Sequence, residues 1–118
     1  MNKWIAYHRG GHELVGRGGL SCAEVDDRRR LEIGWTVMPY LWGGGYATEI
    51  GRAGLAFARE ELGTEDVVAF TEPHNARSRA VMEGLGMRYA RDITHRGEPF
   101  VLYEAVAAAQ ANYLDLKK

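Results

Sequence analysis

Residues 39–49 have the sequence PYLWGGGYATE and separate two apolar patterns of different period. Before them, the apolar run Leu31 to Val37 is typical of a strand. After them, the segment from Tyr46 to Leu62 carries apolar residues at helical spacing, namely Ala47, Ile50, Gly54, Phe57, Ala58 and Leu62. The predicted order is therefore strand, glycine loop and helix.

The glycine loop has the composition of an anion-binding turn. Gly43, Gly44 and Gly45 have no Cβ to block close approach, so their backbone N–H groups can converge on one anion. The positive end of the following helix dipole adds to this effect. A plain connecting turn explains the glycines equally well. The loop lacks the Gly-Lys-Ser/Thr ending of a nucleotide P-loop and the third glycine of a dinucleotide fingerprint, which favours a phosphorylated ligand other than ATP or NAD.

The composition predicts one soluble domain spanning residues 1–118. A net charge of −1 argues against a general nucleic-acid surface. Cys22 is the only cysteine, and the four histidines show no metal-ligand spacing, so we expect neither a disulfide framework nor a metal site. The sequence contains neither an apolar run of the roughly 20 residues that span a membrane nor a signal-peptide core, which predicts a cytoplasmic protein without a membrane partner.

The remaining segments complete an α/β fold with a mixed sheet. We expect an antiparallel hairpin first, and after the glycine loop and its helix a strand, a second helix and a closing antiparallel pair. The predicted ranges are strands 3–7 and 13–22 around a turn at 9–12, a solvated charged turn at 26–30, a strand at 67–70 parallel to the glycine-loop strand, a helix at 75–85, strands at 87–93 and 99–104, and an alanine-rich tail at 105–118. Gly63 and Gly86 are the expected C-terminal caps of the two helices.

Four ordered motifs together resemble the GNAT superfamily of acyl-CoA N-acyltransferases. The residues that carry the likeness are Leu31 to Val37, Trp42 to Glu49, Ala69 to Ser78 and Leu85 to Met87. Within the superfamily they are most similar to the branch that acetylates ribosomal-protein N-termini. The loop departs from the general family pattern at its first position, where Trp42 stands, but tryptophan is usual there in this branch.

The resemblance implies acetyl-CoA as co-substrate and a set of binding residues. Backbone amides of Gly43, Gly44, Gly45, Tyr46, Ala47 and Thr48, beside Trp42, would hold the CoA pyrophosphate. The strand edge near Trp35 and Val37 would pair with the pantetheine arm, and a splay between this strand and residues 67–70 would admit the thioester. Asn75 would bond to the pantetheine arm and also cap its helix.

The chemistry of acyl transfer needs a base for the amine and an acid for the leaving thiolate. Glu32, on the glycine-loop strand, is the best base candidate, and Glu72 is the second; a solvent-facing carboxylate is the alternative for Glu32. Met82 occupies the position of the tyrosine acid found in some relatives. Ser78 matches a serine suggested for that role in the branch, although a first-turn serine that only satisfies its own helix is an equal alternative.

Several other polar residues are expected to be structural or solvent-exposed rather than functional. We expect Cys22 to be a small core residue, and the side chains of Arg77 and Arg79 to be solvated helix charges rather than phosphate ligands. His74 and His95 are expected to be exposed.

Members of the resembled family normally place a strand and two helices before the hairpin, whereas Trp4 already belongs to the predicted hairpin here. The chain thus resembles a truncated GNAT fold, which predicts a homodimer that covers the exposed apolar surface. Two hypotheses stay open. One is an N-acetyltransferase acting on a peptide N-terminus or small-molecule amine, and the other is a non-catalytic module that binds CoA or a partner chain. The sequence does not identify the acceptor amine.

Overall fold

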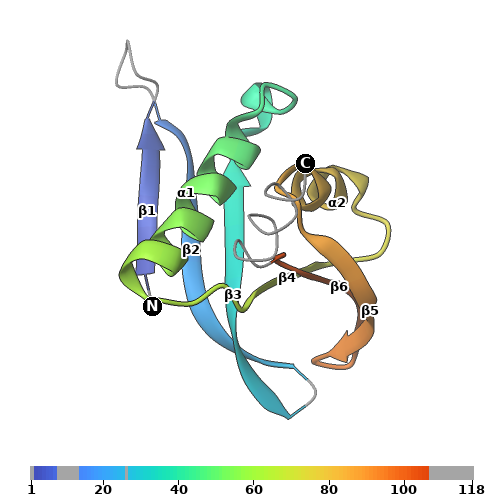
Figure 1. Ribbon diagram of the computed structural model, residues 1–118. Helices are drawn as coiled ribbons and strands as arrows, with labels where there is room; N and C mark the ends of the chain where they lie inside the picture. Colours follow the sequence, from blue (N-terminus) through green and yellow to red (C-terminus); the bar gives the residue numbers. More distant parts are fainter. Residues whose placement is uncertain (1, 8–13, 26, 107–118) are drawn as a thin grey trace, which may run out of the picture.

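The computed structural model describes residues 2–7, 14–25 and 27–106 (Figure 1). In chain order the elements are β1 Asn2–Tyr7, β2 Leu14–Val25, β3 Arg28–Val37, the 3-10 helix η1 Pro39–Leu41, α1 Tyr46–Glu61, β4 Val67–Thr71, α2 Ala76–Gly84, β5 Arg88–His95 and β6 Glu98–Glu104. The predicted α/β class and the order of the elements are confirmed. The predicted turn at 9–12 and most of the predicted tail at 105–118 lie outside the described residues.

The strands form one six-stranded sheet in the order β1-β2-β3-β4-β6-β5. All neighbouring pairs are antiparallel except β3 and β4, which are parallel, as the strand, helix, strand pattern predicted. The parallel pairing covers only two positions, Leu31 with Val67 and Glu32 with Val68. β3 continues to Val37 and β4 to Thr71 without further pairing between them. The sheet therefore forks in its middle, between β3 and β4.

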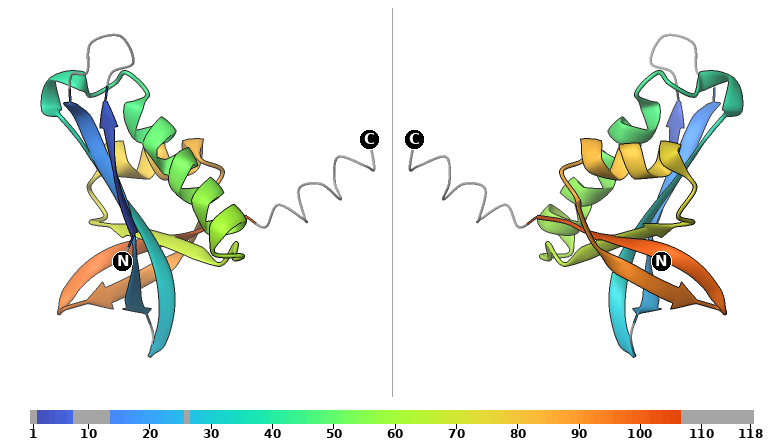
Figure 2. Two further views of the ribbon diagram at one scale, coloured as in Figure 1. Left: turned by 90° about the vertical axis from the view of Figure 1, so that its left-hand side faces the viewer. Right: turned by 90° about the vertical axis from the view of Figure 1, so that its right-hand side faces the viewer.

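Both helices lie on one side of the sheet (Figure 2). α1 lies across β2 and β3, and α2 lies near β4 (Figure 1). The main hydrophobic core fills the space beneath them and includes Leu20, Ile33, Ala58, Met82 and Tyr103. Because side chains alternate along a strand, Ile33 on the helix side places Glu32 on the opposite face of β3. A second cluster lies on that opposite face: Val25, Val68, Ile93 and Leu102.

The charged segment 26–30, expected to be a solvated turn, is one only in part: Asp27 is an exposed turn residue, and Arg28 and Arg29 are exposed strand residues. β3 begins at Arg28, and Arg28 and Arg30 are in register with Val25 and Ala23 of β2. Arg30 is buried, with a relative exposure of 9%. Its two terminal nitrogens lie 2.8 Å from Glu104 Oε2 and 2.5 Å from Asp66 Oδ1. Two carboxylates compensate the desolvation of the guanidinium, which is why this arginine can lie inside the fold.

The packing expected for Cys22 is also wrong. Cys22 is exposed rather than in the core. Phe57 and Leu62 of α1 are partly exposed, at 37% and 44%, because the helix instead buries Ile50, Gly51, Gly54 and Ala58. α2 buries Met82, whereas its alanines at 76 and 80 are exposed. The short α2 thus contributes one large core side chain and leaves the face with the alanines open.

The glycine caps were predicted correctly. Gly63 and Gly86 follow the last turns of α1 and α2 with φ of +68° and +83°. After α2, the Gly86 N–H donates to Glu83 O and the Met87 N–H donates to Met82 O, which is a Schellman motif. This cap turns the chain directly from α2 into β5.

Candidate functional site

The glycine loop runs from η1 to the first turn of α1 with two residues in the left-handed region. Gly43 has φ of +88°, and Gly45, the N-cap residue of α1, has φ of +83°. Only glycine adopts such conformations without strain, so the sequence at these two positions is required by the backbone path. Adding a Cβ at either position would meet no atom within 4 Å, which means that open space lies beside the loop.

The start of α1 lacks the partners that a helix N-terminus normally has. No side chain caps it, and the first backbone bond of the helix runs from the Glu49 N–H to Gly45 O. Within the described residues, no backbone acceptor is recorded for the N–H groups of Tyr46, Ala47 and Thr48. A helix start that leaves its N–H groups unpaired next to open space is suited to bind an anion.

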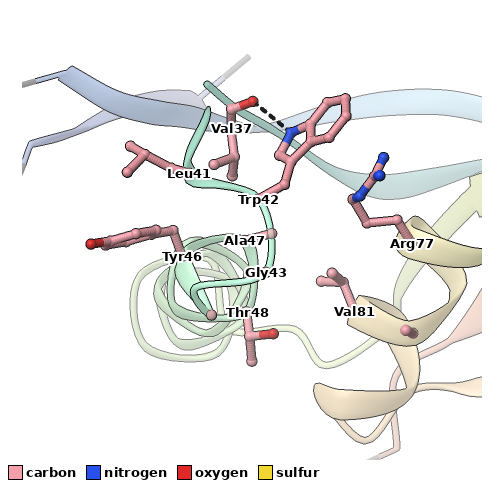
Figure 3. Close-up of a pocket in the computed structure, with 11 residues that line it drawn as sticks. Val37, Leu41, Trp42, Gly43, Tyr46, Ala47, Thr48, Arg77 and Val81 are labelled. Atoms are coloured by element: carbon pink, nitrogen blue, oxygen red, sulfur yellow. Dashed lines mark hydrogen bonds between the residues drawn. The ribbon is translucent and has the colours of Figure 1, made fainter. Parts of the chain in front are cut away.

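Trp42 links the loop to both of its neighbours. Its indole Nε1–H donates a hydrogen bond of 3.0 Å to Val37 O, at the end of β3. On the other side, the guanidinium carbon of Arg77 lies 3.7 Å from the centre of the Trp42 ring (Figure 3). This cation–π contact joins the loop to the first turn of α2. Arg77 is exposed, as expected for a solvated helix charge, and in addition contacts Trp42.

Two adjoining cavities follow the loop and the carboxyl end of β3. They share Val37, Trp42, Ala47, Arg77 and Val81. The larger has a volume of about 250 Å³ and extends along the glycine loop and the first turn of α1; Figure 3 shows it between α1 and α2. The remaining residues that line it are Leu41, Gly43, Gly45, Tyr46, Thr48 and Ala80. The smaller, of about 170 Å³, is also lined by Trp35, Thr36, Asn75 and Ser78.

The two cavities thus bring together all but three of the binding and catalytic candidates that the sequence predicted. Gly44 belongs to the loop but lines neither cavity. Glu32 also lines neither, since its side chain lies on the other face of β3. Glu72, the second base candidate, is exposed, and its Oε2 lies 3.8 Å from Nε2 of the exposed His74.

Glu32 lies where the sheet forks. It is the last residue of β3 that pairs with β4, and from Ile33 to Val37 the β4-facing edge of β3 has no strand partner among the described residues. Burial raises the pKa of the Glu32 carboxyl above its ordinary value. A carboxylate that is half-buried at the opening of a fork and holds its proton more tightly than usual has the properties of a general base.

Asn75 and Ser78 lie at the start of α2. Asn75 is the N-cap residue, and its side-chain oxygen accepts a bond of 3.1 Å from the Ser78 N–H. This confirms the capping role of Asn75. The cap binds only the backbone of Ser78, and both residues line the smaller cavity.

Arg79 holds this end of α2 in place. Its Nη1 donates to Pro73 O at 2.9 Å, and its Nε donates to the hydroxyl of Tyr103 at 3.3 Å. The buried Tyr103 in turn donates to Glu83 at 3.0 Å. Arg79 was expected to be solvated and is instead a structural link between the loop before α2 and β6.

Sequence reasoning gave no site role to four residues that line the larger cavity: Leu41, Arg77, Ala80 and Val81. Arg77 and Val81 are four residues apart, so they share one face of α2, and this spacing was the available signal. The sequence could not show that this face lines a cavity, because the cavity depends on how α1 and α2 are placed relative to each other.

Within residues 2–7, 14–25 and 27–106, no cluster of three or more histidine, cysteine or acidic side chains could hold a metal ion. No helix of the described part of the chain is long and apolar enough to cross a membrane.

Comparisons with known proteins agree with this geometry. A family model described as an acetyltransferase (GNAT) domain matches residues 1–88. The FsC-acetyl coenzyme A-N(2)-transacetylase of Aspergillus fumigatus is 45% identical over 92 residues, which cover 73% of this chain and 38% of that protein. An uncharacterised Bacillus subtilis protein, YkkB, is 32% identical over 104 residues, which cover 88% of this chain and 60% of that protein.

Among solved structures, a GNAT-family acetyltransferase from Bacillus anthracis superimposes with a TM-score of 0.73 at 27% identity. The match covers 88% of this chain and 65% of that one. The present chain therefore spans between about four-tenths and two-thirds of the length of these relatives.

Proposed function

The chain belongs to the GNAT acetyltransferase family, and we propose that it transfers an acetyl group from acetyl-CoA to a primary amine. The observation that carries this proposal is the position of the fork between β3 and β4 next to the glycine loop. A ligand with a diphosphate at one end and an amide-bearing arm at the other matches unpaired helix N–H groups followed by an unpaired strand edge.

The CoA diphosphate would lie against the N–H groups from Gly43 to Thr48. The left-handed glycines leave open space there for its oxygens. The pantetheine arm would then follow the smaller cavity past Trp35 and Asn75 and pair with the free edge of β3. This path brings the thioester to the opening of the fork, close to Glu32.

In the reaction, the amine nitrogen attacks the thioester carbonyl, the new C–N bond forms and the C–S bond breaks. Glu32 would accept the proton of the amine through a water molecule, because a neutral amine is required for attack. Ser78, which lines the same cavity as Asn75, would donate a hydrogen bond to the departing thiolate. The position of Glu32 at the opening of the fork and of Ser78 in the smaller cavity supports these two roles.

The acceptor class that we favour is a peptide N-terminus or a small-molecule amine. The branch of ribosomal-protein N-terminal acetyltransferases is the finer assignment, and the Trp42 loop together with the Asn75–Ser78 spacing supports it. We also propose a cytoplasmic homodimer, which light scattering would test; a mass equal to one chain would contradict the dimer.

The experiment that tests the function has two parts. Calorimetric titration of acetyl-CoA into the purified chain should give saturable binding. A thiol-release assay with a panel of amines should then give CoA formation that depends on the amine. Binding without release would favour a CoA-binding module, and no binding at millimolar acetyl-CoA would contradict the proposed function.

A further inference from the structure

A shallow depression lies on β2 and β3 and shares Trp35 and Thr36 with the smaller cavity near the glycine loop. Its volume is about 350 Å³, and it is lined only by residues of these two strands: Arg17, Gly18, Gly19, Gly34, Trp35 and Thr36. The helices cover the other face of the same strands, yet no helix residue takes part in the lining. The depression therefore lies on the face opposite the helices, which is also the face of Glu32.

We call this depression the trough, and its floor is a pair of glycines. Gly19 of β2 and Gly34 of β3 are directly opposite each other in the antiparallel register. On the same face, the next pair in one direction is Ser21 with Glu32, and the next pair in the other direction is Arg17 with Thr36. The trough is thus bounded by a carboxylate at one end and a guanidinium at the other.

The fold itself does not require a glycine at position 34. A Cβ built there would meet no atom within 4 Å, and its φ is not in the left-handed region. Glycine inside a strand costs about 0.5–1 kcal/mol relative to alanine. A glycine that packing does not explain is typical of a position where a ligand or another backbone comes close.

Among the described residues, neither charge at the ends of the trough has a partner. Arg17 is exposed and forms no salt bridge with any residue that the structure describes. Within the same part of the chain, no recorded hydrogen bond or salt bridge occupies the Glu32 carboxylate. Glu32 and the Arg17–Thr36 pair are four residues apart along β3, or about 13 Å at ~3.3 Å per residue. An extended tripeptide spans roughly 10 Å, which fits between the two side chains.

We propose that this trough holds the acceptor, and that the acceptor is a short extended peptide or amino-acid chain with a free carboxylate. Its amine lies at Glu32, its backbone lies over Gly19 and Gly34, and its carboxylate binds Arg17. The inference rests on the proposed function, because it extends the acceptor side of the same reaction. A polyamine would place a second positive charge beside Arg17 and is a poor acceptor.

Binding to the trough can be measured without turnover. Trialanine is titrated into the ¹⁵N-labelled full chain and followed by NMR, with trialaninamide as the matched ligand that lacks the carboxylate. We expect saturable shifts at the amides of Gly19, Gly34 and Thr36, with about tenfold weaker binding for trialaninamide. In Arg17→Gln the two ligands should bind equally, whereas Arg29→Gln, another exposed strand arginine, should behave as the wild type. Absence of shifts at these amides, or equal binding by wild type and Arg17→Gln, would overturn the proposal.

Gly34→Leu fills the trough and has room to fold. This variant should lose trialanine binding while its calorimetric affinity for acetyl-CoA stays unchanged. If acetyl-CoA fails to bind to wild type while the trough shifts are present, the proposed function fails and the peptide site stands. If acetyl-CoA binds and spermidine is acetylated with a kcat/KM equal to that of trialanine, the acceptor class is wrong and the proposed function stands.

Discussion

The two ends of β3 differ in whether the polar groups there have partners. At its amino end, Arg30 is buried, and its terminal nitrogens reach the carboxylates of Asp66 and Glu104. At its carboxyl end, β3 no longer pairs with β4. The glycine loop that follows leads into the start of α1, where the first N–H groups have no backbone partner in the described chain. Buried polar groups that are paired stabilise a fold, while unpaired groups beside open space are available to a ligand.

This contrast separates the residues that hold the sheet together from those that we expect to take part in binding and turnover. The Arg30 pairs join β3 to the residue before β4 and to the end of β6, so they fix three strands at the closed end of the fork. Among the described residues, the open end is held by the Trp42 bond to Val37, the bond from the Met38 N–H to Val15 O and the stack of Trp42 with Arg77. Substitutions at the open end should therefore affect binding and turnover, and those at the closed end should affect stability.

The largest effect is expected from Gly45→Val at the open end. A β-branched residue at φ of +83° costs about 1–3 kcal/mol, and its side chain fills the space proposed for the diphosphate. We expect at least ~100-fold weaker acetyl-CoA binding by calorimetry. The control is Gly97→Val in the β5–β6 turn, where φ is +80°. It should lower thermal stability to a similar extent and keep the binding affinity; equal losses of affinity in both variants would contradict the loop assignment.

Glu32→Gln tests the chemistry without changing the shape of the site. Loss of a general base should lower kcat about 100-fold or more, while the affinity for acetyl-CoA stays nearly unchanged. The proton on Glu32 is held more tightly than usual, so the acid limb of the wild-type rate profile should lie above the ordinary glutamate range and vanish in the variant. Steady-state rates between pH 5 and 9, with Glu24→Gln as the exposed control, give the answer. Wild-type turnover in Glu32→Gln would remove this residue from the mechanism.

Arg30→Ala tests the closed end. It removes two charge-assisted hydrogen bonds and a buried side chain, so the free energy of unfolding should fall by about 2–4 kcal/mol. Urea unfolding measures this value, and acetyl-CoA affinity at 25 °C should be retained by the folded fraction. Arg29→Ala, its exposed neighbour, should change stability by less than ~0.5 kcal/mol. A loss of affinity larger than the loss of folded protein would mean that the two ends of β3 are coupled.

Arg77→Gln should have a smaller effect at the open end. The exposed cation–π contact with Trp42 contributes about 0.5–1 kcal/mol, so the Kd for acetyl-CoA should rise two- to fivefold. Arg52→Gln, on the exposed side of α1, is the matched loss of one positive charge. If both variants weaken binding equally, net charge rather than the position of Arg77 is responsible.

The smallest expected effect is on the stability of Glu32→Gln. Because burial raises the Glu32 pKa, the ionised carboxylate destabilises the folded state. This cost appears as the pH rises through the unfolded pKa and is complete above the folded one. The variant should therefore be slightly more stable than wild type at pH 7 and equal to it well below the ordinary glutamate pKa. Urea midpoints at pH 7 and pH 3 test this sign, and a variant that is less stable at pH 7 would contradict it.

The sequence was sufficient to predict the class and order of the elements because the local signals agreed with each other. The glycines at 63 and 86 marked helix ends, and the apolar run 67–70 marked the strand that is covered on both faces. The binding loop was also predictable, since its glycines are required by its own backbone. The GNAT likeness then pointed to acetyl-CoA, and the family match supports that assignment.

The errors arose where a side chain depends on a partner that is distant in sequence. Arg30 was read as solvated because its carboxylates are 36 and 74 residues away. Cys22 was assigned to the core from residue type, but its position on β2 turns it outward. The contact of the exposed Arg77 with Trp42 was not predicted, because it requires α2 to face the loop.

The fork has a consequence for the solvent exchange of single amide hydrogens. From Ile33 to Val37, β3 pairs with β2 but not with β4. Backbone N–H groups point alternately to the two sides of a strand, so neighbouring amides of this segment should differ in protection against deuterium. Those that point to β2 should exchange slowly, and those that point into the fork should exchange fast. A bound pantetheine arm would slow only the fast set, so this strand would report occupancy of the fork one residue at a time.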